Sequence, residues 1–220
     1  VSIWLPMNSL ANPVSKLPDV GTTIFTVMSA LASEQGALNL SQGFPDFDGP
    51  EALLQAVNLH MRSGQNQYPP MAGVAALREA IAAKVSDLYG LACDADTEIT
   101  VTAGATEALF CAIAAVVHAG DEVIVLDPAY DSYDPVIRLQ GAVPVHVPLS
   151  APTYRIDWDR IEAAITANTR LLILNSPHNP TGMVMDENDI AALSALCAKY
   201  DIYLIGDEVY EHMVFDRARH

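Results

Sequence analysis

The sequence predicts an α/β fold in which a mainly parallel sheet is covered by helices on both faces. Short apolar runs alternate with helical segments between about residue 98 and residue 205. These runs are apolar throughout and rich in Val, Ile and Leu, which is typical of strands buried on both faces of a parallel sheet. With 220 residues and 51% apolar content, the chain is also long enough to bury a sizeable core.

The N-terminal part of the chain differs in pattern from the rest. Residues 1–50 are rich in Pro, Ser, Asn and Gly and contain one short helical candidate at 22–33, so we predict an arm and a small-domain segment. A regular pattern then begins, with helices expected at 51–62 and 74–88. We therefore predict that residues 51–220 form one large domain.

The sheet is expected to begin at 98–102, a β-branched run that leads into a helix at 106–118 closed by Gly120. Turn residues then separate each strand from the next helix, as Asp127-Pro128 does after the strand expected at 122–126. The remaining elements are expected as helices at 131–140, 157–167 and 186–200 and as strands at 142–147, 170–174 and 202–205. In such sheets, ligands bind beyond the carboxyl ends of the strands.

Composition excludes several classes of function. A formal net charge of -16 with only 11 Lys and Arg argues against a nucleic acid or an anionic membrane as partner. The 3 cysteines are widely spaced without a CxxC pair, and His118, His146 and His178 lack ligand-like spacing, so no metal site is predicted. These histidines are expected at the surface or behind the site. The longest apolar run, 108–117, is too short to span a bilayer, and we expect a cytoplasmic protein.

Small residues at Gly104, Ala105 and Thr106 lie where the first expected strand turns into a helix. Bare amides at a helix N-terminus can receive a phosphate, and the Thr106 hydroxyl adds a donor. The alternative is a tight turn in which Thr106 is only the N-cap. The spacing matches neither a Walker loop nor GxGxxG, so a nucleotide-binding domain has little support.

Two further loops bring polar side chains to strand ends. Asp207 ends an apolar run, and a carboxylate in a low-dielectric cleft stays charged only beside a cation such as a protonated pyridine nitrogen. Tyr210 follows three residues later, so a helical turn after Gly206 would direct both side chains to the same side. Asn179 offers a donor and an acceptor that suit a ligand with a phenolate and a carboxylate, although its loop composition alone predicts only a turn.

Together these motifs carry a family resemblance. From about Lys16 to His212 the chain resembles the N-terminal half of class I, fold-type I pyridoxal-phosphate-dependent aminotransferases, most closely the methionine and kynurenine aminotransferases. The motifs that carry it are LSQGFPDF at 40–47, NQYP at 66–69, VTAGATEAL at 101–109, DPAYD at 127–131, NPTG at 179–182 and DEVY at 207–210.

The resemblance implies pyridoxal 5'-phosphate as cofactor and transamination between an amino acid and a 2-oxo acid as activity. It implies that Asp207 pairs with the pyridine nitrogen, that Tyr210 and Asn179 hydrogen-bond the phenolic oxygen, and that Tyr130 stacks on the ring. The phosphate would be received by the loop of Gly104, Ala105 and Thr106.

Other implied contacts involve the substrate and a second subunit. Gly43 and Phe44 match positions near the substrate, to which Asn179 would also bind, and their apolar surroundings favour a methionine, aromatic or kynurenine-like amino donor. Tyr68 matches a residue that reaches the phosphate of the neighbouring subunit, which implies a homodimer with shared sites.

One family residue has no counterpart in this sequence. The lysine that forms the Schiff base is expected a few tens of residues after Tyr210, whereas the chain offers only Lys16, Lys84 and Lys199. We therefore expect that the large domain lacks its C-terminal part and that the 220-residue chain is inactive alone. A carbon-sulfur β-lyase on the same cofactor and a non-catalytic cofactor-binding fragment remain as alternatives.

Overall fold

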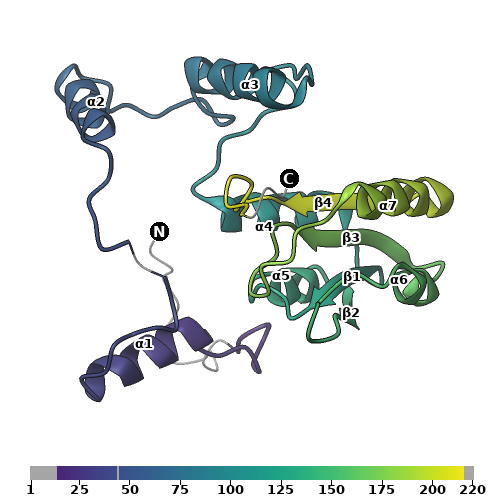
Figure 1. The fold of residues 1–220 in the computed structure, drawn as a ribbon. Helices are drawn as coiled ribbons and strands as arrows, with labels where there is room; N and C mark the ends of the chain where they lie inside the picture. Colours follow the sequence, from purple (N-terminus) through teal and green to yellow (C-terminus); the bar gives the residue numbers. More distant parts are fainter. Residues whose placement is uncertain (1–13, 44, 216–220) are drawn as a thin grey trace, which may run out of the picture. The chain divides into compact units, whose positions relative to one another are not determined.

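A computed structural model of the chain describes residues 14–43 and 45–215 (Figure 1). Within these ranges the chain forms two compact units. One unit is Thr22–Gly104, and the other contains the residues from Ala105 onward together with the segment that ends at Gly21. The predicted boundary near residue 50 lies inside the first unit, and the assignment of domains stays a prediction.

The unit Thr22–Gly104 contains three helices: α1 (Ile24–Glu34), α2 (Glu51–Arg62) and α3 (Ala75–Tyr89). All three were expected from the sequence. Arg78 of α3 is buried, donates to the Gly73 carbonyl oxygen at 3.3 Å and pairs with Asp96 at 3.1 Å, so it ties both flanks of the helix together.

The prediction of a strand at 98–102 is wrong, since this segment is not part of the sheet. The amide of Val101 instead donates to the carbonyl oxygen of Ala72 at 3.0 Å, within its own unit. The turn that contains Gly73 lies so close to Val101 that it requires glycine. Gly73 has φ +96, and a Cβ added there would lie 2.8 Å from the Val101 side chain. A β-branched run becomes a strand only where a neighbour completes its hydrogen-bond ladder.

The second unit contains a parallel sheet with the strand order β2-β1-β3-β4. Its strands are β1 (Glu122–Asp127), β2 (Val143–Pro148), β3 (Thr169–Asn175) and β4 (Tyr203–Asp207). Its helices are α4 (Ala105–Val116), α5 (Tyr133–Leu139), α6 (Trp158–Ala164) and α7 (Glu187–Tyr200). The predicted mainly parallel α/β fold is confirmed.

Side chains alternate between the two faces of this sheet and form one apolar cluster on each face. Val125 and Ile173 pack with α4 and α5, whereas their neighbours Ile124 and Leu172 pack with α6 and α7. Both faces of the central strands β1 and β3 are covered, and their buried residues form the apolar runs that the sequence pattern indicated, whereas the edge strands β2 and β4 are partly exposed.

The parallel register of the sheet brings the carboxyl ends of β1, β3 and β4 to one edge. Asn175, the last residue of β3, pairs with Asp207, the last residue of β4, and β1 ends beside them at Asp127. The loops with predicted chemistry therefore begin at the same edge. Among the described residues, no helix combines the length and apolar character needed to cross a bilayer.

Candidate active site

A cavity of about 150 Å³ lies at the carboxyl edge of the sheet. Its lining comes from the start of α4 and from the loops after three strands. The lining residues are Ala105, Thr106, Leu109, Tyr130, Asn175, Asn179, Asp207, Val209 and Tyr210. The structure thus brings together six of the predicted site residues, although the part that each plays in binding stays a prediction.

Asp207 is held at the tip of β4 by its neighbours. One carboxylate oxygen, Oδ2, accepts a hydrogen bond from the Tyr133 hydroxyl at 2.6 Å, and Oδ1 accepts one from the Val209 amide at 3.3 Å. Its backbone carbonyl oxygen accepts from the Asn175 side chain at 2.7 Å. Both donors to the carboxylate are neutral, so its negative charge is oriented but not cancelled within these contacts.

Tyr133 was not predicted as a site residue. It is the first residue of α5, is 3% exposed, and packs edge-on against Tyr130 with ring centroids 5.8 Å apart. Burial, and then the Asp207 carboxylate beside it, raise the pKa of Tyr133 well above its usual value, so the hydroxyl remains a neutral donor. Its place three residues after Tyr130, across the turn that leads into α5, is the signal that could have indicated it.

Asn175 is a second residue that the sequence reasoning missed. It is 7% exposed and bridges two loops, because its Nδ2 donates to the Asp207 carbonyl oxygen while its Oδ1 accepts from the Asn179 amide at 2.6 Å. The asparagine thereby fixes the backbone of both predicted ligand-binding loops.

His178, expected at the surface or behind the site, precedes Asn179 and is not among the residues that line the cavity. The imidazole is buried, and its Nδ1 lies 2.7 Å from the Thr181 hydroxyl. Burial lowers the pKa of His178, and a hydrogen bond to the backbone of Pro128 only partly opposes this effect. A neutral imidazole therefore connects the loop after β3 to the loop after β1.

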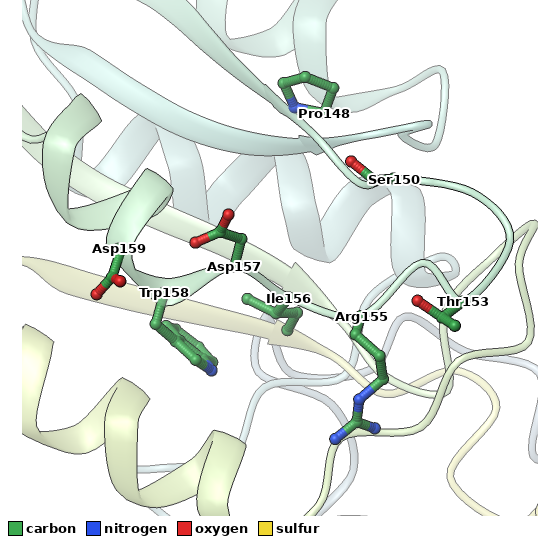
Figure 2. A pocket seen from close by; sticks show the side chains of 8 residues that line it. All are labelled: Pro148, Ser150, Thr153, Arg155, Ile156, Asp157, Trp158 and Asp159. Atoms are coloured by element: carbon green, nitrogen blue, oxygen red, sulfur yellow. The ribbon is translucent and has the colours of Figure 1, made fainter.

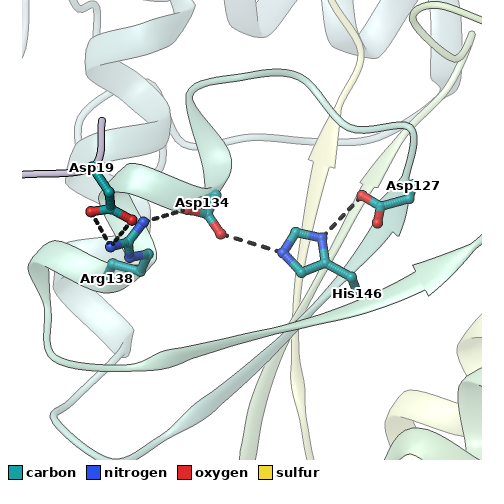
Figure 3. A network of polar contacts seen from close by, with 5 residues as sticks. All are labelled: Asp19, Asp127, Asp134, Arg138 and His146. Carbon is teal, nitrogen blue, oxygen red and sulfur yellow. Dashed lines mark hydrogen bonds and ion pairs between the residues drawn. The ribbon is translucent and has the colours of Figure 1, made fainter. Parts of the chain in front are cut away.

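The loop that carries Tyr130 is also fixed from outside the cavity (Figure 3). At its start, Asp127 lies 3.0 Å from Nδ1 of His146, whose Nε2 lies 3.3 Å from Asp134. Burial alone would lower the pKa of His146, but its hydrogen bonds to these two carboxylates outweigh that effect and raise the pKa. Arg138 extends the network from Asp134 to Asp19, at 2.6 and 2.8 Å, in the segment that ends at Gly21.

The start of α4 forms another wall of the cavity. Gly104 adopts a left-handed φ of +92 immediately before the helix, which glycine tolerates without strain. Since α4 begins at Ala105, Thr106 lies inside the first turn and is not the N-cap. Amides in the first turn of a helix lack intrahelical acceptors and can bind an anion.

The remaining predicted residues are not placed at the cavity. Gly43, Tyr68 and Gly104 belong to the unit Thr22–Gly104, and Phe44 lies outside the described residues, so their roles stay predictions. None of the cavity's described lining residues is a lysine. Lys199 forms an ion pair with Glu162 instead.

A larger cavity, of about 480 Å³, lies beside the start of α6 (Figure 2). It is lined by Pro148, Ser150, Thr153, Arg155, Ile156, Asp157, Trp158 and Asp159. The Arg155 guanidinium is already paired with Asp186 and with Asp189, which also accepts from the Trp158 indole. None of the predicted site residues lies here, so size does not identify the site. In the described part of the chain, no group of His, Cys, Asp and Glu has a metal-binding arrangement.

Comparisons with known proteins agree with the geometry. Residues 35–220 match the family of aminotransferases of class I and II. Methionine aminotransferase of Escherichia coli K12 is 55% identical over 208 residues, which cover 94% of this chain and 54% of that protein. The probable N-succinyldiaminopimelate aminotransferase of Mycobacterium tuberculosis H37Rv is 48% identical, with 94% and 53% covered.

Solved structures show the same relationship. An Escherichia coli structure described as having a methionine aminotransferase function superposes with a TM-score of 0.89 at 56% identity, covering 92% of this chain and 53% of that one. The N-succinyldiaminopimelate aminotransferase structure from Mycobacterium tuberculosis superposes with a TM-score of 0.91 at 48% identity, covering 95% of this chain and 55% of that one. The chain thus spans about half the length of the relatives it matches.

Proposed function

Since this chain belongs to the class I and II aminotransferases, we propose that the full-length protein transfers an amino group between an amino acid and a 2-oxo acid, with pyridoxal 5'-phosphate as cofactor. The family depends on this cofactor, whose protonated pyridine ring withdraws electrons from the α-carbon of the substrate when it is bound.

The observation that carries the proposal is the convergence of Asp207, Asn179, Tyr210 and Tyr130 on one cavity at the strand ends. Asp207 is half-buried, and its carboxylate accepts hydrogen bonds from neutral donors only among the contacts described above. A negative charge that is partly removed from water stabilises a cation placed beside it, which is the requirement of a protonated ring nitrogen. The residues present therefore fit the cofactor.

In the proposed site, the other residues have distinct tasks. Asn179 and Tyr210 hydrogen-bond the phenolic oxygen of the cofactor, and the Tyr130 ring stacks on its face. The amides of Ala105 and Thr106, at the positive end of α4, receive the phosphate.

We propose a large uncharged amino donor, such as methionine, an aromatic amino acid or kynurenine. Leu109 and Val209 give the cavity apolar walls. Similarity to the methionine aminotransferase supports this choice, as does 34% identity over 216 residues to human kynurenine–oxoglutarate transaminase 3. Gly43 and Phe44 would contact this substrate.

We further propose a homodimer in which Tyr68 serves the partner's cofactor. The covalent link to the cofactor requires a lysine, and none of the described residues that line this cavity is a lysine, so we propose the activity for the full-length protein.

The test uses the full-length protein loaded with pyridoxal phosphate and a panel of amino donors with a common 2-oxo acid acceptor. We expect one amino acid product for each 2-oxo acid formed from the donor, with methionine or an aromatic donor preferred. Asp207→Ala should abolish most activity, whereas Asp159→Ala, an exposed carboxylate on α6, should retain it. Ammonia release without amino acid product would favour a carbon-sulfur lyase, and equal activity of both variants would refute the role of Asp207.

A further inference from the structure

We infer that Tyr133 is a positioning residue that orients the Asp207 carboxylate toward the ring nitrogen of the cofactor, an inference that rests on the proposed function. The residue does not line the cavity, and it acts through Asp207.

The contact between the two side chains has the geometry of a strong hydrogen bond. The Tyr133 hydroxyl lies 2.6 Å from Asp207 Oδ2, within the range of a hydroxyl that donates to an ionised carboxylate. Burial and the adjacent carboxylate raise the pKa of Tyr133, so its hydroxyl keeps the proton that it donates. The contact therefore keeps one direction, from tyrosine to carboxylate.

Packing prevents the tyrosine from moving away. Its ring is part of the apolar cluster between the sheet and the helices α4 and α5, which includes Val125 and Ile173. Tyr130 contacts the same ring edge-on. Because the ring is held on several sides, its hydroxyl is a fixed donor that Asp207 must meet.

Two fixed donors determine the plane of the Asp207 carboxylate. Tyr133 binds Oδ2, and the Val209 amide binds Oδ1 at 3.3 Å. An ionised carboxylate has about four acceptor positions, so two remain for a donor in the cavity that Asp207 lines. Without Tyr133, one oxygen loses its donor and the carboxylate can rotate away from the ring nitrogen.

A purely structural role makes a different prediction from a positioning role. A residue that only fills the core would affect stability, and its effect on cofactor binding would not depend on Asp207. A residue that acts through Asp207 loses its effect on binding once that carboxylate is absent. A double-mutant cycle therefore separates the two roles.

The experiment uses the full-length protein and pyridoxamine 5'-phosphate, which carries the ring nitrogen but cannot form a Schiff base with lysine. Affinity is measured by equilibrium dialysis for wild type, Tyr133→Phe, Asp207→Ala and the double variant, and ring-nitrogen protonation is followed by absorbance against pH. Tyr200→Phe is the matched control, because its hydroxyl donates to Glu162 at 2.7 Å on the other side of the sheet.

We expect Tyr133→Phe to weaken binding about tenfold, the lower end for a hydrogen bond to a charged group, and the ring nitrogen to lose its proton at lower pH. Tyr200→Phe should bind like wild type, and the double variant should bind like Asp207→Ala. Wild-type binding by Tyr133→Phe, or an undiminished effect in the Asp207→Ala background, would overturn the inference.

Two further readouts keep the test decisive. If Asp207→Ala itself leaves binding and protonation unchanged, the proposed function fails at Asp207, which is a distinct outcome from failure at Tyr133. If Tyr133→Phe does not fold, 3-fluorotyrosine at this position retains the ring and makes the hydroxyl more acidic. A shifted pH dependence of ring protonation would then support the inference, and an unchanged one would contradict it.

Discussion

Replacing Asn175 by alanine should destabilise the protein and loosen the site together. The side chain is 7% exposed and makes hydrogen bonds of 2.7 Å to the Asp207 carbonyl oxygen and 2.6 Å from the Asn179 amide. The Asp207 carbonyl keeps a second donor, the Ser176 amide at 3.3 Å, so the unpaired Asn179 amide dominates the cost. We expect a loss of about 2–3 kcal/mol in the free energy of unfolding, from two lost hydrogen bonds, one of which leaves the half-buried Asn179 amide unpaired.

The assay is urea unfolding of the full-length protein, together with cofactor affinity. The control is Asn168→Ala, an exposed asparagine before β3, which should change stability by less than about 0.5 kcal/mol. Cofactor affinity should fall for Asn175→Ala and stay constant for the control. If the two variants unfold at the same urea concentration, the bridging role of Asn175 is refuted.

Three more predictions concern pH and packing. Burial places the folded-state pKa of His178 below its unfolded value of about 6.5, so stability should be full above that pH and fall on acidification; His178→Gln should flatten this slope in urea titrations. His146 should have the opposite effect on stability, because its pKa is raised in the folded state. Its contribution to stability is present below about pH 6.5 and is lost as the pH rises through the folded-state pKa, and His146→Gln should remove that loss. Ile173→Ala, at a residue only 1% exposed, should lower the free energy of unfolding by about 2–5 kcal/mol. Leu204→Ala, at a residue that is 45% exposed, should lower it by less, and thermal melts of the two variants measure the difference.

Each of these predictions has a contradicting outcome. Identical pH slopes for wild type and the His178 variant would show that its burial does not influence stability. An alkaline loss that persists without His146 would assign that loss to other groups. Equal costs for Ile173→Ala and Leu204→Ala would contradict the placement of Ile173 in the core.

Much of the fold was predictable because its signals are local. Residues 123–126 are apolar, are followed by a turn and lie in β1, and the same logic located β2, β3 and β4. Parallel strands present their carboxyl ends at one edge, so the meeting of Asn179 and Asp207 followed from topology. The prediction of a strand at 98–102 was wrong because a strand forms only beside a neighbouring strand, which the composition of the segment does not reveal.

The supporting residues of the site were not predictable in the same way. Tyr133 and Asp207 are separated by 74 positions, and Asn175 and Asp207 by 32, so no local pattern connects them. Arg138 and Asp19 are separated by 119 positions. Such partners are determined by tertiary packing. Residues that would contact a ligand can therefore be predicted from the sequence more readily than the residues that position them.

The central claim is that Asp207 holds a protonated ring nitrogen at the carboxyl edge of the sheet. Its most direct test is the NMR chemical shift of an isotope-labelled pyridine nitrogen in the cofactor bound to the full-length protein, compared between wild type and Asp207→Ala. Our account predicts a protonated nitrogen near neutral pH in wild type and an unprotonated one in the variant. An unprotonated nitrogen in wild type, or the same shift in both proteins, would contradict it.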